Sequence, residues 1–347
     1  MPSSTPTRTV ARLLLALTAG AAQATAQGGA GSPAPALTPG LPAPSVTAGP
    51  PASALTPALP VIYVESPREI DLADYLAAWP GLEPYVARLR RGERDAVKAQ
   101  LQSLASAPTP SDGALNLLAQ LEREDGRLDA AEALGAHAIR LNPREHRHHF
   151  QQAMIFFARL AKASGLERWL WHQRTRDAYQ RAFDLDPRPV PYRYYLVYSL
   201  LHTPAFAGGD KAKAQRLAQD GIDLGQKEFL VVRADVQRVR GDDARAFADY
   251  DRAMADRVFN LTSFLAGGQR ALEKGDRARA QRYYVWAIRC RPDSARAHEG
   301  VGDSYAAAGD GRAAAAEYAE ALRLDPRSTS AREKLGRSGA APVRRPG

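Results

Sequence analysis

Residues 295–328, ARAHEGVGDSYAAAGDGRAAAAEYAEALRLDPRS, decide the fold expected of this chain. The stretch predicts two short helices joined by a Gly309-Asp310 turn. Asp325-Pro326 ends the second helix, because proline disfavours a helical residue before it. Small residues stand where the two helices would have to touch, at Gly302, Ala314 and Ala321. The stretch is therefore expected to form a closely packed helical hairpin.

The same arrangement returns 34 residues earlier, in 261–294, and another 34 residues earlier, in 227–260. In each unit a glycine suits the end of a helix, the following aspartate can cap the next helix, and alanines let paired helices approach. A repeat of this length and pattern resembles the tetratricopeptide repeat. The resemblance implies an all-α fold, a right-handed α-solenoid of stacked antiparallel helix pairs.

The repeat pattern sets the expected domain organisation. We expect an array of about six units over 112–328, preceded by a divergent N-terminal helical cap over 61–111. A capping helix and a basic disordered tail are expected over 329–347. The alignment of residues 190–226 to the repeat pattern is fixed only to within two residues.

Two units are longer than the period, with insertions near 163–173 and 202–209. Both insertions fall between the first and second helices of their units. Because those turns project from one edge of a stacked array, we expect the two insertions to be neighbours.

The N-terminal residues have the order of a secretory signal. Arg8 and Arg12 precede a short apolar run and a small-x-small cleavage site, which predicts a signal peptide over 1–26. The alternative is a disordered start that happens to be leucine-rich. Residues 27–60 are rich in proline and alanine and are expected to form a disordered linker. These features predict an exported protein, periplasmic or secreted, with no transmembrane span in its mature form.

The net charge and the cysteine content exclude few classes of function. The net charge is +9, but basic residues mostly alternate with acids, as on a solvated helical surface. Cys290 is the only cysteine, so no internal disulfide is possible, and its position favours packing over nucleophilic chemistry.

The resemblance implies a concave groove lined by the first helix of each unit, in which a peptide or partner segment would lie. Transferring the groove positions to this sequence gives Phe150, Met154, Phe157, Tyr194, Tyr198, Asp235, Arg238, Gln269 and Asp303. For the two phenylalanines and Met154, packing in the core is an equal alternative. The insertions add a second candidate surface, with Trp169, Trp171 and Phe206 as partner contacts. For the two tryptophans, additional core packing is the alternative.

Many members of this family hold the C-terminal carboxylate of a chaperone with lysine, asparagine and arginine. Here Phe150, Val231, Leu265 and Glu299 stand where a lysine would be needed. This departure argues against carboxylate clamping and favours an apolar ligand segment flanked by basic residues.

The sequence gives no sign of catalysis, of a cofactor or of a metal site. No P-loop, G-x-S-x-G or H-E-x-x-H motif occurs. His146 and His149 lie one helical turn apart, but no matching set of four ligands accompanies them. We interpret 146–149 as a histidine cluster on the surface at a helix start.

The leading interpretation is a non-enzymatic scaffold of the cell envelope or secreted space that binds a protein or peptide. The first alternative is an enzyme or accessory subunit acting on envelope polysaccharide, with a site around Trp169 and Glu167. The second alternative, nucleic-acid binding, is suggested by the pI of about 9.7 but opposed by the signal segment. We therefore expect no nucleic-acid partner.

Overall fold

The computed structural model describes residues 62–63 and 76–338, and within them the chain forms two compact units. Unit 1 comprises 76–242, and unit 2 comprises 243–338 together with 62–63. The predicted signal peptide over 1–26, the linker over 27–60 and the tail after 338 lie outside the described residues.

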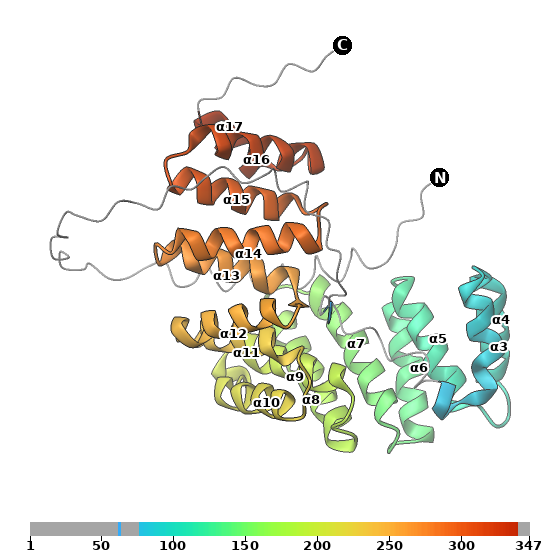
Figure 1. The fold of residues 1–347 in the computed structure, drawn as a ribbon. Coiled ribbons are helices and arrows are strands. Elements are labelled where there is room, and N and C mark those ends of the chain that lie inside the picture. Colours follow the sequence, from blue (N-terminus) through green and yellow to red (C-terminus); the bar gives the residue numbers. More distant parts are fainter. Residues whose placement is uncertain (1–61, 64–75, 339–347) are drawn as a thin grey trace, which may run out of the picture. The chain divides into compact units, whose positions relative to one another are not determined.

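Unit 1 is built from antiparallel helix pairs (Figure 1). Its elements, in chain order, are η2 (Pro80–Leu82), α3 (Glu83–Arg90), α4 (Arg94–Ala105), α5 (Asp112–Glu124), α6 (Leu128–Leu141), α7 (His146–Lys162), α8 (Gly165–Leu185), α9 (Val190–His202), η3 (Ala205–Ala207), α10 (Lys211–Asp223) and α11 (Phe229–Arg240).

Unit 2 continues the same construction, and Figure 1 shows its helices stacked one after another. A two-residue parallel pairing joins β1 to β2, with Ile62 opposite Val258 and Tyr63 opposite Phe259. The elements are α12 (Asp243–Ala255), β2 (Val258–Phe259), α13 (Leu261–Glu273), α14 (Arg277–Cys290), α15 (Ala295–Ala307), α16 (Gly311–Leu324), α17 (Thr329–Arg337) and β1 (Ile62–Tyr63). The predicted all-α solenoid of antiparallel helix pairs is confirmed.

The turns between paired helices follow from local chemistry. Gly309 has φ +84°, which glycine adopts without the steric cost of a Cβ. The next residue, Asp310, accepts a hydrogen bond from the backbone N–H of Ala313 at 2.9 Å and so caps α16. Asp210 and Asp276 cap α10 and α14 in the same way.

The close approach of helices is explained by small residues facing aromatic rings. Ala314 and Ala321 are fully buried on α16. A Cβ on Gly302 would lie 2.5 Å from the ring of Tyr318, so only glycine fits there without a shift. The helical-hairpin expectation for 295–328 is confirmed, including its three small contact residues.

The first insertion extends the helices instead of forming a loop. α7 has 17 residues and α8 has 21, and α8 begins at Gly165, where φ is +55°. The second insertion forms the short η3 turn. Arg176 Nη1, on α8, donates a hydrogen bond of 2.6 Å to the carbonyl oxygen of Ala207. The elements that carry the two insertions are therefore neighbours, as stacking predicts.

Among the described residues, no helix is both long enough and apolar enough to cross a membrane.

Candidate partner-binding site

The predicted groove residues of unit 1 lie on α7, α9 and α11, each the first helix of a pair. On α7 they are part of the core: Phe150 is 1% exposed, Met154 3% and Phe157 9%. The Phe150 ring contacts Tyr192 on α9, with centroids 4.6 Å apart. Tyr179 donates its hydroxyl hydrogen to Met154 Sδ at 3.4 Å. Their burial favours the packing alternative, and partner contact by these three side chains stays a prediction.

A more open group lies where α9 faces α11. Tyr198 is half-buried, and its hydroxyl donates a hydrogen bond of 2.6 Å to Asp235 Oδ2. Arg238 Nη2 lies 3.3 Å from Asp235 Oδ1, and the arginine side chain is 21% exposed, against 5% for the aspartate. Asp235 thus holds both a tyrosine and an arginine at the surface. Predicted groove residue Tyr194 is buried beneath them, with its ring 4.8 Å from that of Tyr198.

His202 ends α9 and stacks on Tyr198, with ring centroids 5.9 Å apart and planes 9° from parallel. Burial lowers the pKa of His202 to about 4. The negative charge of Asp235 opposes this shift, while the positive charges of Arg238 and Lys211 and the neighbouring His172 add to it. The imidazole is therefore neutral at pH 7. It supports the Tyr198 ring from one side as an uncharged aromatic group.

The two predicted groove residues of unit 2 have different surroundings. Gln269 is exposed on α13 and donates a hydrogen bond of 3.4 Å to Glu273. Asp303 on α15 accepts hydrogen bonds from the hydroxyl of Tyr318 at 2.9 Å and from Lys334 Nζ at 2.7 Å. The carboxylate of Asp303 therefore links α17 to α15 through Lys334.

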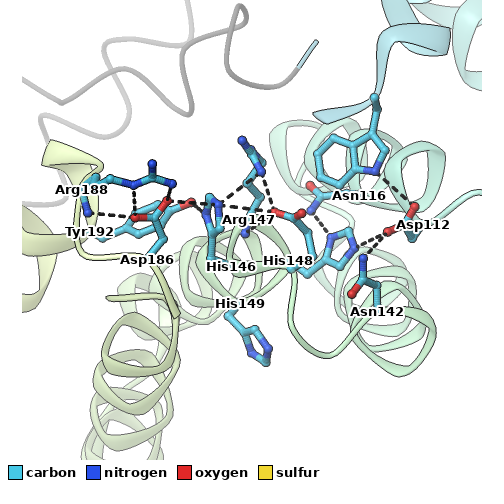
Figure 2. Close-up of polar contacts among 12 residues, drawn as sticks. Asp112, Asn116, Asn142, His146, Arg147, His148, His149, Asp186, Arg188 and Tyr192 are labelled. Carbon is cyan, nitrogen blue, oxygen red and sulfur yellow. Dashed lines mark hydrogen bonds and ion pairs between the residues drawn. The ribbon is translucent and has the colours of Figure 1, made fainter. Parts of the chain in front are cut away.

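A buried polar network surrounds the start of α7 (Figure 2). Asn116 Nδ2 donates to His148 Nδ1 at 2.6 Å, and His148 Nε2 donates to Asp112 Oδ2 at 3.1 Å. Asp112 also accepts from Trp79 Nε1 at 3.2 Å and from Asn142 Nδ2 at 3.3 Å. These contacts tie α5, α6, α7 and the segment before η2 together.

The charge states in this network follow from its burial. Burial lowers the pKa of His148, so the imidazole is neutral, with its proton on Nε2 in this hydrogen-bond pattern. For Asp112, burial acts to raise the pKa, but the hydrogen bonds from His148 and Asn142 outweigh it and lower the pKa. Asp112 is therefore an ionised acceptor for neutral donors.

His146 takes part in a second network on the other side of the α7 start. Its Nδ1 is hydrogen-bonded with the hydroxyl of Tyr192 at 2.8 Å, and its Nε2 lies 3.4 Å from Asp186 Oδ2. Asp186 in turn accepts two hydrogen bonds from the Arg188 guanidinium, each of 2.9 Å. Figure 2 shows this network beside that of His148.

The interpretation of 146–149 as a surface cluster was wrong for His148, which is fully buried. The reason is tertiary: the partners of His148 come from α5, 32 to 36 residues earlier. The described residues contain no group of three or more ligand side chains placed to hold a metal ion.

On the insertion edge, Trp171 is packed rather than presented. It is 8% exposed, and the guanidinium carbons of Arg159 and Arg174 lie 5.0 and 4.9 Å from the centre of its ring. Its Nε1 donates to Glu167 Oε1 at 3.1 Å. Because Glu167 serves this packed indole, it gives little support to the polysaccharide-site alternative, which required Glu167 beside Trp169.

The other predicted edge residues are more accessible. Phe206 is 83% exposed on η3, whereas Trp169 is half-buried. Sequence reasoning missed Leu166 and Leu170, which are 81% and 40% exposed on the first turns of α8. Their spacing of four residues in a helix was the signal that could have identified a shared face.

The fold defines an α-solenoid of helix pairs, and comparison with known proteins adds a family resemblance. Residues 265–329 and 302–341 match the family model of the tetratricopeptide repeat. No curated protein matches this chain significantly. The repeat match and the fold together support a tetratricopeptide-repeat protein.

Solved structures with the same fold have low sequence identity to this chain. A tetratricopeptide repeat protein from Parabacteroides merdae is 12% identical, with TM-score 0.54, over 74% of this chain and 96% of its own. PilW, a type IV pilus biogenesis factor, is 14% identical, with TM-score 0.52, over 65% of this chain and 98% of its own. A chain of the APC/C hetero-tetramer Cut9-Hcn1 is 14% identical, with TM-score 0.53, over 77% of this chain. The match spans about half, 51%, of the length of the APC/C chain.

Proposed function

We propose that this chain is a non-enzymatic scaffold that holds an extended segment of a protein partner against α9 and α11 of unit 1. Helical-repeat folds of this kind present long surfaces for protein partners, which supports the class of function. The observation that carries the location is the Tyr198–Asp235–Arg238 group. It is half-open, whereas the apolar groove positions on α7 are filled by core packing.

The chemistry of this group defines what it would bind. Tyrosine and arginine are the residue types that most often dominate protein interfaces, because they combine contact area with directed hydrogen bonds. The accessible part of the Tyr198 side chain offers apolar contact area, and the Arg238 guanidinium offers a positive charge to a carbonyl or carboxylate oxygen. Asp235 restrains both side chains before binding, which reduces the entropy lost on association. An acceptor-bearing apolar segment therefore fits better than one flanked by basic residues.

We also propose that the protein acts after export, in the periplasm or outside the cell. The support is the order of Arg8, Arg12, apolar run and small-residue cleavage site in the sequence. Comparing the N-terminus of the protein purified from its own cells with the encoded sequence tests this proposal. A mature chain that still begins at Met1 would contradict it.

Selection from a library of displayed random peptides tests the binding proposal. The full chain is immobilised, and recovered peptides are then measured against a Tyr198→Ala variant. We expect weak, micromolar-range binders whose affinity falls at least about tenfold in the variant. Tyr305→Ala, on the half-buried tyrosine of α15, is the control and should bind as the parent does. Equal affinity for parent and Tyr198→Ala would overturn the location.

A further inference from the structure

Three large apolar side chains project from the edge formed by the two insertions. Leu166 is 81% exposed, Phe206 83% and Leu170 40%. Leu166 and Leu170 lie one helical turn apart on α8 and so share a face. Phe206 is held beside the same helix, because Arg176 donates its hydrogen bond to the carbonyl oxygen of neighbouring Ala207. We call this surface the insertion edge.

The segments that carry these apolar groups, 162–177 and 202–213, contain six lysines and arginines against three aspartates and glutamates. Lys162 and Lys211 are exposed and Arg168 is half-buried, and none of the three forms an ion pair among the described residues. The three acids of the same segments each have a partner, but within the described part of the chain only Asp177 is paired with a cation. Glu167 accepts from Trp171, and Asp177 pairs with Arg176. Asp210 caps α10 by accepting from the backbone of Ala212 and Lys213. The insertion edge therefore combines projecting apolar groups with an excess of positive over negative charge.

We propose that the insertion edge docks the protein on an anionic lipid bilayer. Leucine and phenylalanine side chains enter the boundary between headgroups and acyl chains, while lysine and arginine contact lipid phosphates. This inference is independent of the partner site on α9 and α11. It would give the scaffold a second attachment, through lipid.

The shape of the edge favours a bilayer over a protein partner. Protein interfaces bury their main anchors in well-packed pockets. Here Leu166 and Phe206 project separately from two turns and are almost fully exposed. A fluid bilayer accepts separate protrusions without needing a matching surface, and its negative charge complements Lys162, Arg168 and Lys211.

Vesicle co-sedimentation of the full chain tests the proposal. One set of vesicles contains equal amounts of phosphatidylcholine and phosphatidylglycerol, and the other contains phosphatidylcholine alone. We expect binding to the anionic vesicles that weakens at high salt, because screening reduces the attraction of the cations. The triple variant Leu166→Gln, Leu170→Gln, Phe206→Gln should bind at least about tenfold more weakly.

A matched control separates this edge from exposed apolar residues elsewhere. Leu141 and Leu224 are 44% and 64% exposed at the C-terminal ends of α6 and α10, away from the insertion turns. The double variant Leu141→Gln, Leu224→Gln should keep the parent's vesicle binding. Parent and variants are compared with the same N-terminus, so a contribution from that region is common to all.

Three outcomes would overturn the proposal. These are no binding of the parent to anionic vesicles, equal binding to both kinds of vesicle, and unchanged binding of the triple variant. Loss of binding to a protein partner in the triple variant, without any vesicle binding by the parent, would assign the edge to a protein instead.

Discussion

The ring of Tyr284 occupies the space beside Gly300, so closely that a Cβ built on this glycine would lie 2.4 Å from the ring. A Cβ on Gly268 would lie 2.7 Å from the same ring. One tyrosine of α14 is thus packed between glycines of α13 and α15. Because neither glycine has a side chain, α13, α14 and α15 can pack closely around the Tyr284 ring.

Replacing Gly300 by alanine should therefore destabilise unit 2. The added methyl group forces Tyr284 or the helices to move, and overpacking of this kind costs about 1–3 kcal/mol in the free energy of unfolding. Chemical unfolding followed by circular dichroism measures the change. Gly311→Ala is the control, because among the described residues its Cβ would meet only the Ser338 carbonyl oxygen, at 3.5 Å. Equal stability of the two variants would show that Tyr284 has room to move.

The features predicted correctly from the sequence are those determined by neighbouring residues. The turn at Gly309, the cap at Asp310 and the small contact residue Gly302 each depend on geometry within one helical hairpin. Because the same local rules apply to each repeat, the helices and turns can be predicted without knowing how the repeats stack. The all-α solenoid follows from them.

The features that sequence reasoning missed or left open depend on residues far apart in the chain. Phe150 is covered by rings from α8 and α9, and the register of α9 could not be fixed beforehand. His148 finds its partners Asn116 and Asp112 on α5. The first insertion is helical, as part of α8, which runs without interruption from Gly165 to Leu185. Repeat spacing alone specifies none of these contacts.

Replacing Asp112 by alanine should destabilise unit 1. The change leaves the buried His148 Nε2–H and the Trp79 and Asn142 donors without their acceptor. We expect a loss of about 2–3 kcal/mol in the free energy of unfolding, since stranded buried polar groups retain their desolvation cost. As a control, Asp129→Ala removes a 96% exposed carboxylate and should change stability by less than about 1 kcal/mol. A loss for Asp112→Ala no larger than for Asp129→Ala would contradict the structural role of the network.

His202 should make unit 1 less stable in acid. Its pKa is about 4 in the folded chain, below the ordinary histidine value of 6.5, so the unfolded chain binds the proton more readily. The free energy of unfolding should fall as pH drops from 6.5 toward 4, by at most about 1.4 kcal/mol per pH unit from this group.

Urea unfolding across that pH range measures the effect. His202→Gln should flatten the decline. Part of it will remain, because burial also lowers the pKa of His146, His148 and His172 in the same unit. Identical slopes for parent and variant would show that His202 is not protected from protonation.

Lys334 should hold α17 in place. Its Nζ lies 2.7 Å from both Glu299 Oε1 and Asp303 Oδ2. Replacing it by alanine leaves two carboxylates without this shared cation, which should cost about 1 kcal/mol and speed hydrogen exchange in α17. Arg337→Ala, an 80% exposed side chain on the same helix, is the control and should leave exchange unchanged. Similar exchange in both variants would mean that α17 is held by its packing alone.

The partner-binding claim rests on Arg238 and is tested most directly by a pair of arginine variants on α11. Arg238 is paired with Asp235, the residue that also accepts from Tyr198, whereas Arg240 is exposed at the end of the same helix. The measurement is the Kd, by isothermal titration calorimetry, of a peptide selected on the parent chain. We predict that Arg238→Ala weakens binding at least about tenfold and that Arg240→Ala leaves it unchanged. Parent-like affinity in Arg238→Ala, with the fold intact, would contradict the proposed site.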